Sequence, residues 1–417
     1  FNTANSNVGI GDAALINNTS AVGSTAVGYN AGYSTTINPV TAIGYRTLYL
    51  SNGANNTAVG YFASFLNTSG EQNTSIGSFA LYNNTTGSYN VAVGSGSSAS
   101  NTTGSNNTSL GATSLNSNTT GGSNVAIGTY ALQLSTTANA NVAIGTGSML
   151  FTTSGSNNVA VGSTSLYNNT TGYDNIAIGL QSQYFNTTGD SNISIGRESL
   201  RANTTGYYNT AIGKKSLFTN TTGSQNIAIG HESLYTANGT LNNIAIGYSA
   251  LRSTTSGNSN IMIGSNAGYY NTSGNLNVGI GADALGRNTT GYINVAIGSS
   301  ALFANTTGRL NTAVGDGALQ NNTTGEENVA VGRGSLSSSV STNRNTAIGT
   351  SALQNTTTGG YNTAVGALAS LSNTTGAYNT ALGYQTLLTN TTGTSNIGIG
   401  SQALYFNTTA SSNLAIG

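Results

Sequence analysis

The chain has 417 residues, of which 5% are charged, and its ten basic residues balance its ten acidic ones. Ordinary soluble domains carry about 25% charged residues, so an ordinary globular domain is excluded. Zero net charge gives no field to attract nucleic acid, so we expect no nucleic-acid partner. No apolar run reaches the ~20 residues of a membrane span, so we expect no membrane insertion in this segment. One histidine without any cysteine leaves no zinc site, and we expect no cofactor.

A repeated 17-residue unit runs along the sequence. Its most constant residue is the glycine that closes an Ala-Ile-Gly-like triplet, found at Gly11, Gly28 and Gly44 and then, from Gly60, at a constant 17-residue spacing to Gly417. Only the steps that end at Gly44 and Gly60 are shorter, each by a single residue. Such self-similarity is typical of stacked repeat proteins. We therefore expect residues 1–417 to form a single continuous array of 25 rungs, slightly irregular over 29–66, with no other domain.

With that glycine as position 0, each unit has Asn at −4, a small residue at −2, Ile, Val or Leu at −1, a small residue at +3, Leu at +4 and Asn-Thr-Thr-Gly at +7 to +10. Positions −4 to 0 alternate as a strand does. We expect a second strand at +2 to +6, and a turn at +7 to +10 in which glycine supplies positive φ. The fold class predicted is all-β: a parallel β-solenoid, or β-roll, with rungs about 4.8 Å apart and a total length of roughly 120 Å.

Identical positions in successive rungs form columns. The small face at −2 fits the inside of a thin roll, and the bulky face at −1 needs a cover, either Leu at +4 of the same chain or another chain. The predicted core columns include Ile178, Ile195, Ile212, Ile229, Ile246, Ala177, Ala211, Ala228, Leu200, Leu217 and Leu234. The asparagines at −4 are expected to form a ladder, which includes Asn175, Asn192, Asn209, Asn226 and Asn243.

Charged residues test this register, because opposite charges recur in one column of neighbouring rungs. The pairs expected to meet are Arg309 with Glu326, Glu327 with Arg344, and Asp316 with Arg333, together with the series Glu198, Lys215 and Glu232. Exposed pairs contribute little free energy, so they indicate register more than stability.

The pattern Asn-x-Ala-Ile-Gly-x-x-Ser/Ala-Leu resembles the YadA-like head repeats of trimeric autotransporter adhesins. The 17-residue Asn-Thr-Thr-Gly-containing unit is still more similar to arrays in bacterial and phage tail-fibre-like proteins. The resemblance implies a left-handed parallel β-roll, three chains side by side with the column at −1 facing the three-fold axis, and an adhesive or spacer role outside the cell or on a virion. The adhesin head unit is shorter than the unit of this chain, so the Asn-Thr-Thr-Gly turn is an enlargement here.

These observations predict a structural shaft or spacer and not an enzyme. The chain would associate with itself, as a homotrimer or an end-to-end filament, at a cell or virion surface. The alternative is a repetitive binding module, in which exposed tyrosines at +11 and +12 contact glycans or a host-surface protein: Tyr89, Tyr173, Tyr208, Tyr361 and Tyr378. Ice binding by threonine columns is less favoured, because the threonines at −3 are interrupted by Val and Ile.

Candidate sites of other kinds are sparse. The one histidine, His231, is expected to be a solvated rung-edge residue, and it leaves no catalytic triad to assemble. Asn-x-Thr sequons make glycosylation possible in a secreted protein, at Asn84, Asn118, Asn169, Asn220, Asn305 and Asn390. The competing interpretation is that these asparagines only build the turn and a ladder.

Overall fold

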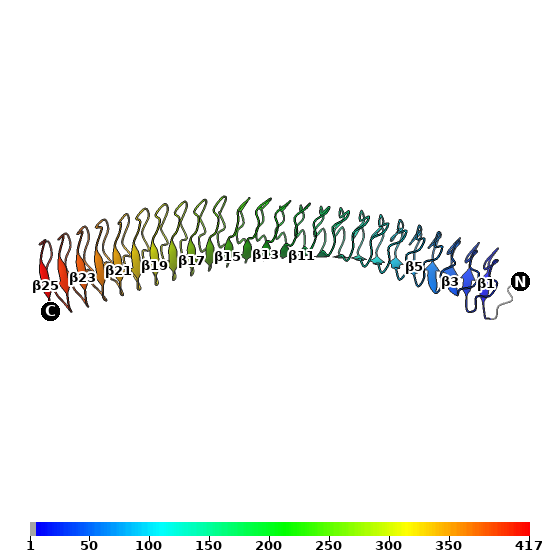
Figure 1. Ribbon diagram of the computed structural model, residues 1–417, viewed down its shortest axis with the longest axis horizontal. Coiled ribbons are helices and arrows are strands. Elements are labelled where there is room, and N and C mark those ends of the chain that lie inside the picture. Colours follow the sequence, from blue (N-terminus) through cyan, green and yellow to red (C-terminus); the bar gives the residue numbers. More distant parts are fainter. Residues whose placement is uncertain (1–5) are drawn as a thin grey trace. The chain divides into compact units, whose positions relative to one another are not determined.

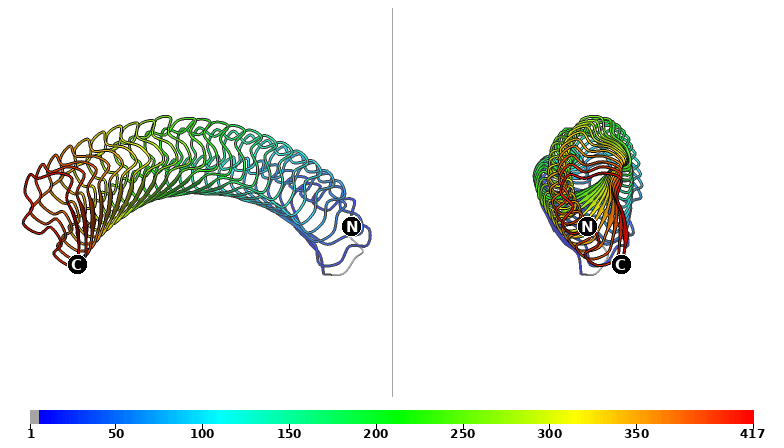
Figure 2. Two further views of the ribbon diagram at one scale, coloured as in Figure 1. Left: turned by 60° about the vertical axis from the view of Figure 1, so that its left-hand side comes forward. Right: turned by 90° about the vertical axis from the view of Figure 1, so that its left-hand side faces the viewer.

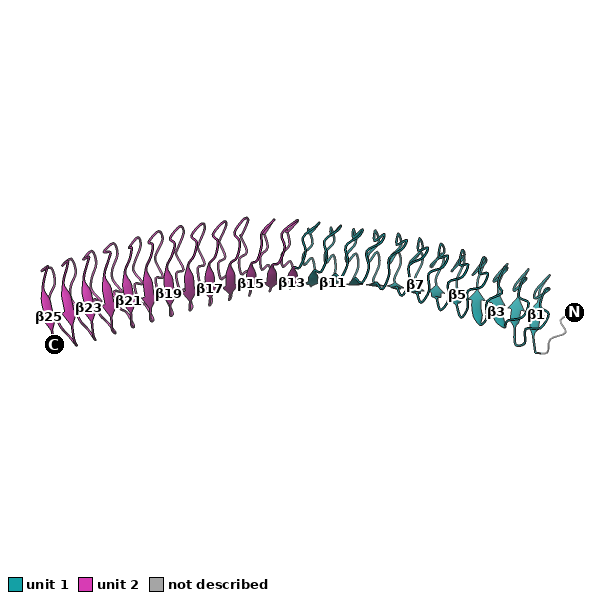
Figure 3. Cartoon of the chain, in the orientation of Figure 1, with its two compact units in different colours: residues 1–208 teal, residues 209–417 magenta. Residues whose placement is uncertain are grey.

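The computed structural model describes residues 6–417, which divide into two compact units after Tyr208. Figure 3 colours the two units separately. In the described residues the regular secondary structure consists of short strands, one in each rung, and contains no helix. Each strand covers positions −3 to −1, and β3 and β4 start one residue earlier.

The first unit contains β1 (Val8–Ile10), β2 (Thr25–Val27), β3 (Val40–Ile43), β4 (Asn56–Val59), β5 (Thr74–Ile76), β6 (Val91–Val93), β7 (Thr108–Leu110), β8 (Val125–Ile127), β9 (Val142–Ile144), β10 (Val159–Val161), β11 (Ile176–Ile178) and β12 (Ile193–Ile195). The second unit contains β13 (Thr210–Ile212), β14 (Ile227–Ile229), β15 (Ile244–Ile246), β16 (Ile261–Ile263), β17 (Val278–Ile280), β18 (Val295–Ile297), β19 (Thr312–Val314), β20 (Val329–Val331), β21 (Thr346–Ile348), β22 (Thr363–Val365), β23 (Thr380–Leu382), β24 (Ile397–Ile399) and β25 (Leu414–Ile416).

Consecutive strands of a unit pair in parallel, with identical positions side by side. Ala228 of β14 pairs with Ala245 of β15, and Val27 of β2 pairs with Ile43 of β3 across one of the two shorter steps. Within each unit the strands follow one another in chain order (Figures 1 and 2). The predicted parallel β-solenoid is thereby confirmed for each unit, whereas one uninterrupted array over residues 1–417 stays a prediction.

The core of a rung is formed by the alanine at −2 and the leucine at +4. Ala211, Ala228, Leu217 and Leu234 are all fully buried. In the first unit, Ala177, Leu115, Met149 and six further apolar residues form one buried cluster. Leucine therefore covers the small face of the strand. Of the two covers considered for the bulky face at −1, the leucine at +4 of the same chain is therefore ruled out.

The column at −1 lies on the opposite side of the strand and is only partly buried in a single chain. Ile178 and Ile195 keep 37% and 38% of their surface exposed, and Ile212, Ile229 and Ile246 are half-buried. The prediction of these five isoleucines as core residues is therefore wrong for one chain. The physical reason is the strand alternation itself, because neighbours at −2 and −1 point to opposite faces.

The predicted second strand at +2 to +6 is also wrong, because this segment is a series of turns. Residues at +2 and +4 adopt left-handed φ near +50°, for example Asp283 and Leu285, which costs an L-residue about 1–2 kcal/mol each. The backbone still bonds to both neighbouring rungs. The amide of Leu285 donates to the carbonyl of Ala301 at 3.0 Å, and that of Asp283 to Ser265 at 2.9 Å.

The two recurrent glycine positions of a rung have different causes. At position 0, Gly298 has φ +134°, and a Cβ there would lie 2.5 Å from the carbonyl oxygen of Gly315. At +10, Gly308 does not have positive φ, so the predicted reason for that glycine is wrong. A Cβ on Gly308 would instead lie 2.4 Å from Oδ1 of Asn305. The second glycine makes room for the asparagine at +7.

Candidate functional site

The asparagines at −4 form the predicted ladder. Asn192 donates from its backbone amide and from Nδ2 to Oδ1 of Asn175, at 3.1 and 3.2 Å. Asn226 bonds in the same way to Asn209, and Asn243 to Asn226. Each Nδ2 also reaches across its own rung, as in the 2.8 Å bond from Asn209 to the carbonyl of Gly223. All five side chains are buried.

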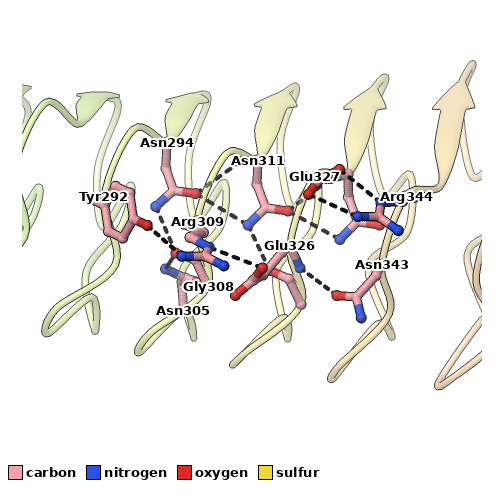
Figure 4. A network of polar contacts seen from close by, with 12 residues as sticks. Tyr292, Asn294, Asn305, Gly308, Arg309, Asn311, Glu326, Glu327, Asn343 and Arg344 are labelled. Carbon is pink, nitrogen blue, oxygen red and sulfur yellow. Dashed lines mark hydrogen bonds and ion pairs between the residues drawn. The ribbon is translucent and has the colours of Figure 1, made fainter.

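A second asparagine ladder occupies position +7. Asn305 Nδ2 donates to Oδ1 of Asn288 at 2.7 Å and to the carbonyl of Gly308 at 3.0 Å. Gly308 also accepts a 2.9 Å bond from Asn294, a member of the first ladder. The two ladders therefore converge on the carbonyl at +10, as Figure 4 shows for this part of the second unit.

The predicted sequon asparagines all belong to the second ladder. Asn84, Asn118, Asn169, Asn220, Asn305 and Asn390 are fully buried, and each Nδ2 donates to the glycine carbonyl at +10 of its own rung. An N-linked glycan is attached through this same Nδ2 atom. A glycan on this atom would be incompatible with the bonds of the folded rung, and the ladder accounts for the asparagines.

Threonines at +8 form a third column. Thr289 Oγ1 donates to the carbonyl of Thr306 at 2.9 Å, and Thr306 Oγ1 donates to Thr323 at 3.0 Å. In the first unit Thr85 makes the same 2.9 Å bond to Thr102. These hydroxyls face the backbone of the next rung and so brace the turn.

Two of the predicted charge pairs meet, both in the second unit (Figure 4). Nε of Arg309 lies 3.0 Å from Oε2 of Glu326, and Nε of Arg344 lies 2.9 Å from Oε2 of Glu327. Nη1 of Arg344 also donates to the hydroxyl of Tyr361 at 2.6 Å. The hydrogen bond from Arg344 lowers the pKa of the Glu327 carboxyl, and Glu327 in turn raises the pKa of Arg344.

Of the other predicted charge contacts, the pair of Asp316 and Arg333 differs from expectation. Asp316 and Arg333 are exposed neighbours at +1, yet the described residues include no ion pair between them. Solvent competes well for charges at such a rung edge. Glu232 binds Nε of Arg252 at 2.8 Å, although Arg252 stands at +5 of the next rung and not at +2.

Within that predicted series, the hydrogen bond from Arg252 and, more weakly, the charge of Lys215 lower the pKa of Glu232. Lys215 and Glu198 also have contacts outside their column. Nζ of Lys215 lies over the ring of Phe218, 5.4 Å from its centroid. Oε2 of Glu198 lies 4.0 Å from Nε of Arg197. A long charged side chain can thus turn toward an aromatic ring or a neighbour in its own rung. The column position of the residue does not specify which of these contacts it makes.

The tyrosines at +11 and +12 are exposed: Tyr89, Tyr173, Tyr208, Tyr361 and Tyr378. Tyr361 and Tyr378 stack with ring centroids 5.0 Å apart. Asp190, in the next rung at the same position, raises the pKa of Tyr173. His231 stacks on Tyr248 at 5.4 Å, and the described residues contain no group of three side chains suited to a metal ion.

An aromatic cluster in the short rungs of the first unit was not predicted. Tyr29, Tyr45 and Tyr61 stack at +1 with centroids 5.3 Å apart. Beside them Tyr33, Tyr49, Phe65 and Tyr82 stack at +5. The guanidinium of Arg46 lies 5.5–5.9 Å from three of these rings. The signal was present in the sequence as aromatic residues repeated at the rung spacing.

The outer face of the strands is a regular, partly exposed surface in each unit. It consists of the columns at −3 and −1, which we call the outer strand face. In β18 these positions hold Val295 and Ile297, half-buried and 39% exposed respectively. Because the strands pair in register, position −1 forms a row of Ile, Val and Leu in each unit. Position −3 forms a row mostly of Val, Ile and Thr, as where Val295 pairs with Thr312. Contiguous apolar surface of this kind marks interaction sites in soluble proteins.

The described residues include no helix long and apolar enough to cross a membrane. Comparison with known protein families and with characterised proteins found no match to this chain.

Proposed function

We propose that this chain is a structural shaft or spacer of an extracellular filament, adhesin or tail-fibre-like protein at a cell or virion surface. The observation that carries the proposal is the bonding between rungs around the whole perimeter. Backbone amides bond to the neighbouring rung in the strand, in the turns and at +8, as in Val295 to Asn311, Leu302 to Ala318 and Thr306 to Thr323. Asparagine and threonine ladders add to these bonds, so many parallel columns share a load along the stack.

Self-association is the second part of the proposal. The outer strand face remains partly exposed in a single chain, although its column at −1 consists of Ile, Val and Leu. Fully burying an exposed Ile, Val or Leu side chain gains about 1.5–3 kcal/mol. These side chains are already largely buried, with 37–38% of the surface left at Ile178 and Ile195, so each gains roughly 0.5–1 kcal/mol and many rungs would add up. We propose that copies associate through this face, and the similarity to adhesin head repeats favours three copies.

The test is the mass of the full chain by light scattering, together with the particle length by negative-stain microscopy. Three times the 41.8 kDa chain mass, in particles of roughly 120 Å, is the expected result. The double variant Ile280→Asp, Ile297→Asp, on the outer strand face, should lower the mass while circular dichroism stays unchanged. A wild-type mass of one chain would overturn the self-association, and globular particles would overturn the shaft.

Adhesion is the second candidate function, and the exposed tyrosines favour it. Five of them recur at +11 and +12 over many rungs, where weak contacts would add through avidity. A glycan or host-surface protein would be the partner. Replacing Tyr361 and Tyr378 by serine should then weaken attachment to cells or glycan-coated beads severalfold without changing the mass of the particle.

A further inference from the structure

In the second unit a column of stacked side chains at +5 is interrupted at one rung. Phe218 and Tyr235 stack with centroids 5.2 Å apart. The guanidinium of Arg252 continues the column, 5.0 Å from the ring of Tyr235 and 5.7 Å from that of Tyr269. The next residue of the column is Gly286, which has no side chain.

This gap leaves Tyr269 without a stacked neighbour in the following rung, while Tyr270 of its own rung meets its ring edge to face, with centroids 4.6 Å apart. Arg252 covers Tyr269 from the preceding rung, whereas the following rung offers only the backbone of Gly286. The column resumes at Phe303, whose ring leans toward the gap. Two of its carbons lie 3.0 Å from where a Cβ of residue 286 would stand.

A cavity of about 240 Å³ lies at this gap. Tyr269, Tyr270 and Phe303 supply its aromatic walls, and Asn266, Asp283 and Arg287 supply its polar groups. Drug-sized ligands occupy roughly 300–1,000 Å³, so this cavity fits a single ring. In the described part of the chain, neither Asp283 nor Arg287 forms an ion pair. The guanidinium of Arg287 lies over Phe303 at 5.0 Å.

We propose that this gap, which we call the Gly286 notch, binds one pyranose ring of a neutral saccharide. The electron-rich face of an aromatic ring attracts the polarised C–H groups on one face of a pyranose, and Tyr269 presents such a face. Asp283 accepts hydrogen bonds from sugar hydroxyls, and Arg287 and Asn266 donate to them. One acid and one base in the same cavity favour a ligand without net charge.

An apolar aromatic ring, such as a tyrosine or tryptophan side chain of a peptide, is the competing occupant. It would use the aromatic walls but leave three polar side chains without ligand partners, and desolvating polar groups without replacement bonds is costly. A pyranose can both pack against the aromatic rings and form hydrogen bonds with the polar side chains. This proposal does not depend on the shaft function, because the notch is formed by three consecutive rungs of one chain.

The test is ligand-observed NMR on the full chain with methyl glucoside, methyl galactoside, methyl mannoside and methyl N-acetylglucosaminide, with phenol as the aromatic probe. We expect saturation transfer to one face of at least one pyranoside, with millimolar affinity. Gly286→Gln should weaken this binding at least tenfold, because glutamine fills the notch. Glutamine occurs naturally at the same position of other rungs, as Gln320 and Gln354. Because a Cβ at residue 286 would lie 3.0 Å from two carbons of Phe303 and 3.1 Å from the carbonyl oxygen of Asp283, the variant is compared only after its circular dichroism matches the wild type.

Asp283→Asn and Arg287→Gln test the polar wall, and Asp316→Asn and Arg333→Gln are matched controls at exposed positions outside it. The first two should weaken binding at least fivefold and the controls should leave it unchanged. Absence of binding by all four pyranosides would overturn the proposal. So would phenol binding alone, or pyranoside binding that Gly286→Gln does not affect.

Discussion

Each rung bends at a glycine that combines a forbidden conformation with a close contact. In Gly298, φ is +134° and an added Cβ would lie 2.5 Å from a backbone oxygen of the next rung. Gly317, at +2, has φ +62°, and its nearest neighbour, Oε1 of Gln320, would be 3.4 Å from a Cβ. Other rungs carry L-residues at +2, such as Ser300 with φ +51°. The two glycines therefore differ in how far they tolerate a side chain.

We expect Gly298→Ala to lower the free energy of unfolding by about 3–5 kcal/mol, through strain and overpacking. Gly317→Ser, the matched control, should lower it by about 1 kcal/mol. Urea denaturation of both variants, with hydrogen exchange of the neighbouring rungs, measures the difference. Equal effects of the two substitutions would show that the close contact at position 0 does not control stability.

The pair of Glu232 and Arg252 should make stability depend on pH. The hydrogen bond from Arg252 lowers the pKa of Glu232 below its ordinary value of 4.5, against the opposing effect of burial. A lowered pKa in the folded state means that the stabilisation is present above pH 4.5 and is lost as pH falls through the folded value. The pair is partly exposed, so it contributes at most about 1 kcal/mol.

Glu232→Gln should therefore lower the urea midpoint at pH 7 and have no effect at about pH 2. Asp316→Asn, where the described residues form no such pair, is the control and should change neither midpoint. If the Glu232→Gln difference persisted unchanged in acid, the carboxylate charge would not be the source of the stabilisation.

Among the elements, the asparagine columns have the most specific bonding. Oδ1 of Asn311 accepts from the backbone amide and Nδ2 of Asn328, at 3.0 and 3.1 Å, and its own Nδ2 donates to the carbonyl of Gly325 at 2.8 Å. Both asparagines are buried. Removing the side chain would leave the buried backbone amide of Asn328 without a partner. It would also take one of two bonds from the Gly325 carbonyl and from Nδ2 of Asn328.

Asn311→Ala should lower the free energy of unfolding by about 2–4 kcal/mol, because each buried group left unpaired costs about 1–3 kcal/mol. Thr312→Ala is the neighbouring control. Its side chain belongs to the half-buried column at −3, so a change below about 1 kcal/mol is expected. Thermal or urea unfolding of the pair distinguishes them, and a smaller effect at Asn311 than at Thr312 would contradict the ladder's role.

The strand and its register were predictable from sequence, because a strict 17-residue period and a two-residue alternation leave one arrangement for positions −4 to 0. The second strand was not predictable in its true form. Leu285 alternates with its neighbours as a strand residue would, yet it has φ +53°, and left-handed leucine has no sequence signal. The small face at −2 was correctly predicted to lie inside. Alternation separates Ala296 from Ile297, but it does not say which of the two faces Leu302 covers.

In the candidate site, contacts of short side chains could be predicted from their column position, whereas contacts of long, flexible side chains could not. Short-range ladders of Asn294 and Asn311 follow directly from column position. Arg252 could instead reach Glu232 from another column because its side chain is long and stacks on aromatic rings. The Gly286 notch has a sequence signal, because a glycine interrupts a column of mostly aromatic residues. That this glycine leaves a cavity becomes apparent only when the rungs are stacked.

For the whole molecule, the near-additive energetics of repeat arrays give a test of the shaft. Deleting four complete units, residues 282–349, should leave a folded protein that is about 19 Å shorter, with unchanged dichroism per residue. Deleting residues 282–340, which ends inside a unit, should unfold the neighbouring rungs because the columns no longer match. Electron microscopy and protease sensitivity report the two outcomes, and equal tolerance of both deletions would contradict column matching.

The asparagine ladder has a direction. In the second unit, Oδ1 of each asparagine at −4 accepts from the rung that follows it in the chain, as Asn294 does from Asn311 and Asn311 from Asn328. During synthesis, a rung leaving the ribosome therefore finds acceptors that its predecessor has already positioned. The finished part of the chain thus presents asparagine acceptors to the nascent part, while its own amides at −3, +4 and +8 pair only when the following rung is added, as in Val295 with Asn311.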